Sequence, residues 1–142
     1  MFNSHTYLYL KFLAKSVSKH GVHSPFVYDL VTKCLNEKDK RLNKEVPKST
    51  RIAKKVINYF NTTEYVFLKD SFCKINEVEN LLEQFDNDSY MIIKDPYQSK
   101  SRRLLWNQLI QLETVSVSVD TFYLGLLFVR KEQPKQHFAI RV

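Results

Sequence analysis

Two aspartates stand where an α/β sheet commonly binds its ligands. Asp70 and Asp95 each follow a short apolar run, residues 65–68 and 90–93, that is typical of a buried parallel strand. In open α/β sheets, ligands bind in the crevice beyond the carboxyl ends of the strands. Carboxylates at this edge can contact a ligand or serve as acid–base groups. An aspartate after a strand also commonly forms a turn or caps a helix, and we assign Asp120 to a turn.

No other residues group into a catalytic or metal-binding pattern. His20 and His23 are three positions apart, but no third ligand stands at a suitable spacing, so we predict no metal site. A serine nucleophile on a strained strand–helix turn needs flanking glycines. The chain has only two glycines, Gly21 and Gly125, which also excludes glycine-rich phosphate and dinucleotide loops. We therefore predict no catalytic residue, and the two strand-end aspartates are cofactor contacts only if a cofactor binds.

The hydrophobic pattern predicts helices first and a sheet afterwards. Residues 1–48 are predicted to form an N-terminal helical appendage that ends in a charged connector, and residues 49–142 an α/β domain. Four principal strands and a candidate for a short last strand are expected in the domain, at residues 65–68, 90–93, 115–119, 124–129 and 137–142. The short link between the third and fourth strands predicts an antiparallel hairpin.

Capping residues predict where four of the helices begin. Ser24, Ser49 and Ser99 each precede an apolar helical stripe, and serine is a preferred N-cap residue. Asn76, with a glutamate three positions later, resembles a capping box. An earlier helix is expected to run from about residue 4 to Lys19, with apolar residues at helical spacing.

The positive charge is concentrated in the first part of the chain. The net charge is +7; residues 1–60 hold 12 Lys and Arg against four Asp and Glu, whereas residues 61–142 hold ten against 11. Such a block often binds phosphate-rich partners, although a solvated helical surface explains it as well. No apolar run approaches the roughly 20 residues of a membrane span, and the lysine-broken N-terminus does not resemble a signal peptide. We therefore expect a cytoplasmic protein without a membrane partner.

Three segments resemble parts of a known protein family. Residues 20–30 (HGVHSPFVYDL) resemble the N-terminal signature of a group of bacterial class I S-adenosylmethionine (SAM)-dependent methyltransferase-like proteins. Residues 115–142 resemble the C-terminal end of that group, and residues 88–93 are similar to the fifth strand of its sheet. The resemblance covers about half of the chain and is distinctive at both ends.

The resemblance also implies a strand order. In the family, the last strand is antiparallel to the others and inserts beside the fifth. We therefore expect a truncated Rossmann-like sheet of about four strands, preceded by N-terminal helices. Its last strand is antiparallel, and the expected spatial order is residues 65–68, 90–93, 124–129 and 115–119.

The middle of the chain departs from the family pattern. The family's first strand leads into a glycine-rich loop that holds SAM, but residues 69–72 (KDSF) stand there if residues 65–68 are the first strand. Alternatively, residues 65–68 match the fourth strand. In either alignment, several strands and the SAM loop are missing. Residues 94–98 (KDPYQ) keep one of the family's paired acids, Asp95, and lack its histidine.

These departures predict a degenerate SAM-dependent methyltransferase-like protein that binds no cofactor and acts as a regulatory or interaction module. One alternative is an active methyltransferase that completes its site with a partner chain, with Asp70 and Asp95 contacting SAM. Another is a nucleic-acid-binding protein that uses the basic residues 1–60. A shortened sheet leaves residues 65–68 as an apolar edge, which predicts a homodimer through that edge or its cover by the N-terminal helices.

Overall fold

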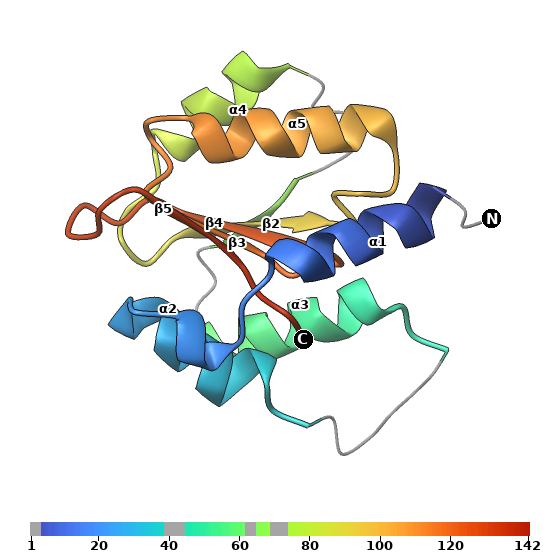
Figure 1. Cartoon of the computed structure of the whole chain (residues 1–142). Coiled ribbons are helices and arrows are strands. Elements are labelled where there is room, and N and C mark those ends of the chain that lie inside the picture. The colour runs from blue at the N-terminus through green and yellow to red at the C-terminus, as the bar shows by residue number, and fades with distance from the viewer. Residues whose placement is uncertain (1–3, 39–44, 62–64, 69–73) are drawn as a thin grey trace.

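The computed structural model describes residues 4–38, 45–61, 65–68 and 74–142. The helices are α1 (Ser4–Lys15), α2 (Pro25–Leu30), α3 (Lys48–Phe60), α4 (Ile75–Leu82) and α5 (Lys100–Gln111); a 3-10 turn spans Lys19–Gly21, and a π-helical turn, Val31–Leu35, continues α2. The strands are β1 (Tyr65–Phe67), β2 (Tyr90–Lys94), β3 (Val117–Asp120), β4 (Leu124–Phe128) and β5 (Gln136–Ala139). The sheet lies between two helical layers, α4 and α5 on one side and α2 and α3 on the other (Figure 1). No helix in the described ranges is long and apolar enough to cross a membrane.

Within the described residues, five strands form one mixed sheet in the order β1-β2-β4-β3-β5. β4 is antiparallel to both of its neighbours, β2 and β3, whereas β1 pairs in parallel with β2 and β5 pairs in parallel with β3. The expected antiparallel hairpin of β3 and β4 is therefore confirmed, and so is the pairing of β4 with β2.

The predicted sheet of about four strands is too small: the candidate short last strand at residues 137–142 is present as β5, and β4, which is antiparallel as expected, is not the last strand. The last strand is β5, which is parallel to β3 and extends the strand order beyond it. β5 carries little hydrophobic signal because it lies at an edge of the sheet, where only Phe138 of its four residues is buried. An edge strand of this kind lacks the alternation of apolar and polar residues by which strands are recognised in a sequence.

Alternation along β3 separates the interior into two cores. Val117 and Val119 belong to the core on the side of α2 and α3, to which the N-terminal helices contribute Val27 and Leu30. The N-terminal helices thus pack directly on the sheet. Because side chains alternate along a strand, Ser118 and Asp120 lie on the other face of the sheet, which α5 covers.

Two of the predicted helix caps are confirmed and two are wrong. The hydroxyls of Ser24 and Ser99 accept hydrogen bonds from backbone amides three residues later, at 3.4 and 3.2 Å. In contrast, α3 begins before Ser49, with Pro47 at its N-cap, and α4 begins before Asn76. Ser49 therefore lies inside the first turn of α3, and its hydroxyl donates to a carboxylate of a distant segment, as described below.

α1 ends at Lys15, earlier than predicted, because the residues that follow join the edge of the sheet. Val17 forms a parallel bridge with Ile140. Its amide donates to the carbonyl of Ala139 (2.8 Å), and its carbonyl accepts from the amide of Arg141 (3.3 Å). Extended backbone at this position is incompatible with a continuing helix. As a result, α1 lies beside the sheet, at a level between the two helical layers (Figure 1).

A packing contact requires a glycine at position 125. Gly125 lies in β4, and a Cβ atom built on it would stand 2.6 Å from two atoms of the Trp106 indole. Trp106 is 1% exposed, so the ring has no free space into which it could move. The absence of a side chain in β4 therefore allows the indole of α5 to lie directly against the sheet.

We expect Gly125→Ala to lower the free energy of unfolding by about 1–3 kcal/mol, because overpacking forces either the indole or the strand to shift. Urea unfolding at neutral pH measures the change. The matched control is the same substitution in a Trp106→Leu background, where the added methyl group meets no indole. An alanine that destabilises both backgrounds equally would contradict this explanation.

Candidate functional site

Asp95 lies at the carboxyl end of β2, as predicted, and its contacts are with the protein itself. Its backbone has a positive φ of 49°, and its amide donates to the carbonyl of Tyr123 (2.9 Å). Its carboxylate Oδ2 accepts a hydrogen bond from the hydroxyl of Ser49 (3.0 Å), a buried residue in the first turn of α3. The carboxylate thus links α3 to the end of β2. It lies near the N-terminus of α3, where the helix dipole favours a negative charge. The other predicted contact, Asp70, lies outside the described residues.

Asp120, which the sequence pattern assigns only to a turn, has more contacts than Asp95. It is 1% exposed. Its Oδ1 accepts a hydrogen bond from the amide of Phe122 (2.8 Å), which is the predicted turn. Its Oδ2 accepts hydrogen bonds from Trp106 Nε1 (3.0 Å) and from the hydroxyl of Tyr97, which the sequence pattern does not reveal. We call Tyr97, Trp106 and Asp120 the Asp120 cluster.

The electrostatics of the Asp120 cluster keep Tyr97 protonated. Burial raises the pKa of Tyr97 far above its usual range, and the charge of Asp120 and the hydrogen bond to it raise it further. The hydroxyl is therefore a permanent hydrogen-bond donor near neutral pH and not a general base. Three donors of the protein therefore satisfy the buried carboxylate of Asp120 by hydrogen bonds.

Aromatic side chains of α1 cover the loops next to the Asp120 cluster. Phe12 is 2% exposed, and its ring centroid lies 5.6 Å from that of Phe122 and 6.3 Å from that of Tyr97. Tyr9 lies 5.0 Å from Phe122, whose ring stacks on Tyr97 at 4.7 Å. Phe122 has a positive φ of 72°, which bulky residues rarely adopt. This conformation turns the β3–β4 loop so that its ring packs between α1 and the Asp120 cluster.

A second polar pair lies next to the Asp120 cluster, and no sequence signal marks it. Ser118 of β3 and His137 of β5 are cross-strand partners, with 2.6 Å between Ser118 Oγ and His137 Nδ1. The Trp106 indole contacts the imidazole edge-on, at 6.3 Å between ring centroids. Although part of the His137 side chain is exposed, desolvation by the surrounding protein lowers the pKa of its imidazole; the charge of Asp120 opposes this effect, and that of Lys15 adds to it. The imidazole is therefore mainly neutral near pH 7.

The described residues contain no group of three His, Cys, Asp or Glu side chains that could hold a metal ion. His20 and His23, the pair considered from the sequence, are both exposed. The thiol of Cys34 is buried, and burial raises its pKa to about 11. It is therefore a poor nucleophile near neutral pH, because the thiolate is the reactive form.

Basic side chains gather on the first turns of α3. Lys48 lies over the ring of Tyr123, with 4.6 Å between Nζ and the ring centroid. Burial lowers the pKa of Lys48, and the charges of Arg51 and Lys55 lower it further. Like charges at this spacing repel one another, and an anionic partner would reduce that repulsion. These residues belong to the basic region 1–60 that the sequence analysis identified.

The chain matches no protein-family model, no curated protein and no solved structure. The resemblance to SAM-dependent methyltransferases therefore stays a prediction. A functional assignment has to rest on the residues described above and on their geometry.

We expect Tyr97→Phe to lower the free energy of unfolding by about 1.5–3 kcal/mol, because Asp120 then loses a donor to a buried charge. Urea unfolding measures the effect, and Tyr28→Phe is the matched control. Tyr28 is 42% exposed, so removing its hydroxyl should change the stability by no more than about 0.5 kcal/mol. Equal changes in the two variants would show that the hydrogen bond to Asp120 contributes nothing.

Proposed function

We propose that the chain is a shortened, methyltransferase-like module that does not transfer methyl groups itself and acts by binding a partner. One observation carries the proposal: the two strand-end carboxylates of the described residues, Asp95 and Asp120, bind donors of the protein itself. Asp95 accepts a hydrogen bond from Ser49, and Asp120 accepts three. With three donors, Asp120 has little remaining capacity to hold a charged amino acid moiety or a ribose hydroxyl, and the Oδ2 of Asp95 is already engaged by Ser49.

The distribution of glycine supports the same proposal. SAM carries a charged methionine moiety, a ribose and an adenine, and related methyltransferases hold these groups with a glycine-rich turn after the first strand. This chain has no glycine between Gly21 and Gly125. A side chain at every position in between obstructs close approach of the backbone to such a ligand. Two carboxylates alone do not enclose a ligand of this size.

The surface that we propose for partner binding is the outer edge of β1, and the partner is a second copy of the chain. Among the described residues, β1 pairs on one side only, with β2. The amide of Leu68 donates to the carbonyl of Ile92 (2.9 Å), so the backbone groups of Tyr65 and Phe67 point away from β2. The side chains of β1 are only partly buried. An open apolar edge of this kind favours pairing with another strand.

A second candidate function is nucleic-acid binding, and the repulsion among basic residues of α3 favours it. The charges of Arg51 and Lys55 both act on Lys48. A phosphate backbone would neutralise them and release counterions, so affinity for an oligonucleotide would fall steeply as the salt concentration rises. Pairing of apolar strand edges does not weaken in this way. The salt dependence of an observed interaction therefore distinguishes the two candidates.

The isolated chain is expected to show no saturable binding of SAM or of its demethylated product in isothermal titration calorimetry. Saturable binding in the micromolar range would overturn the proposal. If that binding is lost in Asp95→Ala but kept in Asp88→Ala, a methyltransferase site at the end of β2 would be the better explanation. Asp88 is an exposed acid in a turn away from that strand end and serves as the matched control.

Phe67→Lys is expected to convert a dimer into a monomer, because a charged side chain on an edge strand opposes pairing. Light scattering over a range of protein concentrations measures the molar mass. Leu104→Lys is the matched control, since Leu104 is an equally apolar residue that is 55% exposed on α5. A wild-type chain that is monomeric at every concentration, or a dimer that survives Phe67→Lys, would contradict the role of the β1 edge.

A further inference from the structure

A group of polar and basic side chains lies where α1, α5 and β5 meet. Ser118 and His137 share a short hydrogen bond (2.6 Å), and Trp106 of α5 contacts the imidazole. Lys15, in the last turn of α1, stands two residues before Val17, whose bridge to Ile140 places the end of α1 beside β5, and its charge acts on His137. Residues from three separate parts of the chain therefore converge on one surface region.

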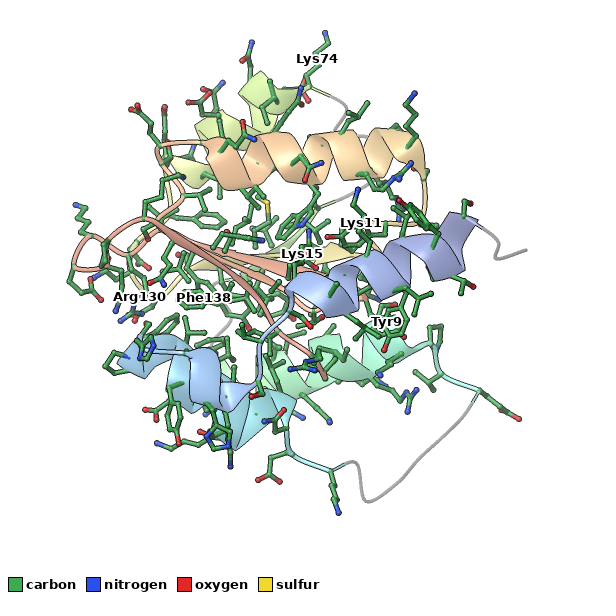
Figure 2. All side chains as sticks on the ribbon, viewed as in Figure 1. Tyr9, Lys11, Lys15, Lys74, Arg130 and Phe138 are labelled. Carbon is green, nitrogen blue, oxygen red and sulfur yellow. The ribbon has the colours of Figure 1, made fainter. Side chains whose placement is uncertain are left out.

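Two lysines of α1 supply positive charge to this region. Lys11 and Lys15 are one helical turn apart and so share a face of the helix. Figure 2 shows both on the side of α1 toward α5, opposite to Tyr9. Both are exposed, and neither forms an ion pair with an acid of the described ranges. The carboxylate of Asp120 does not neutralise them through a bond, because its partners are other donors.

The imidazole of His137 can complete a binding site for an anion. Its Nδ1 bonds to Ser118, and among the described residues no hydrogen-bond partner is found for Nε2. The hydroxyl of Ser118 can donate to a neutral imidazole or accept from a protonated one, so the pair tolerates both states. The charged groups that act on His137 are Asp120 of β3 and Lys15 of α1. Trp106, its contact on α5, does not titrate.

We propose that Lys11, Lys15 and His137 bind a phosphate group, either as the free ion or at the terminus of a small phosphomonoester. Such a group carries about −1.5 to −2 charges near pH 7, which two ammonium groups match, and its terminal oxygens accept hydrogen bonds from several directions. A bound anion favours the protonated imidazole, so anion binding and protonation of His137 are coupled. This inference goes beyond the proposed function, because it involves neither the β1 edge nor the carboxylate of Asp95.

The test follows the imidazole signals of His137 by NMR in pH titrations with sodium phosphate or with sodium chloride at equal ionic strength. Phosphate is expected to raise the pKa of His137 by about half a unit or more relative to chloride. A second arm replaces inorganic phosphate with glycerol phosphate. A response to both supports a site for the phosphate group alone, whereas a response to glycerol phosphate only supports a site for the ester.

Two variants identify the groups that bind the anion. Lys11→Gln combined with Lys15→Gln should reduce the affinity for phosphate at least tenfold, and both residues are exposed, so the fold should persist. Lys74→Gln is the matched control, since Figure 2 shows Lys74 on the far side of α5 from α1. Equal pKa values of His137 in phosphate and chloride would overturn the proposal. So would a response that survives the double variant, or a loss as large in Lys74→Gln.

Discussion

A carboxylate that is 1% exposed has to be hydrogen-bonded, and this requirement at Asp120 determines much of the surrounding structure. Trp106 reaches Asp120 only because its indole lies against β4, where Gly125 leaves room for the ring. Tyr97 reaches it from the turn after β2, a turn that begins with a residue of positive φ. Phe122 donates its amide from a strained loop conformation. Each of these three donors thus depends on an uncommon local feature.

The same constraint connects the hairpin to α1. Once the amide of Phe122 bonds to Asp120, the aromatic ring stacks on Tyr97 and becomes the surface against which Phe12 of α1 packs. In the described residues, the edge of the sheet at which α/β proteins commonly bind ligands therefore holds aromatic contacts and acids that are hydrogen-bonded within the protein.

Most features that depend on neighbouring residues could be predicted from the sequence, the cap at Asn76 being an exception, whereas most features that depend on distant residues could not. Ser24 and Ser99 cap helices because their partners are three positions away. Ser49 has the same local pattern, yet its hydroxyl bonds to Asp95, whose position no local rule reveals. The α/β class and the β3–β4 hairpin follow from hydrophobic runs and a short link.

The candidate sites were harder to predict than the fold. Asp95 stands at a strand end, as expected, but the donor of its hydrogen bond comes from α3. The Asp120 cluster joins the β2–α5 turn, α5 and β3, and the pairing of Ser118 with His137 requires a fifth strand whose residues are mostly exposed. Side chains that meet only through tertiary packing leave no periodic signal, which is why these groups could not be found before the sheet order was known.

The bridge between Val17 and Ile140 has a consequence for the kinetics of folding. It joins residues about 120 positions apart, and closing a loop of that length carries an entropic cost that no local contact offsets. Because the bridge lies beside β5, which itself pairs with β3 only through a sheet contact, α1 should dock late in folding and detach early in local unfolding. Transient opening of α1 would then expose the aromatic rings and the paired acids together. The segment that covers the Asp120 cluster would thus be joined to the sheet by one of the contacts of greatest sequence separation in the chain.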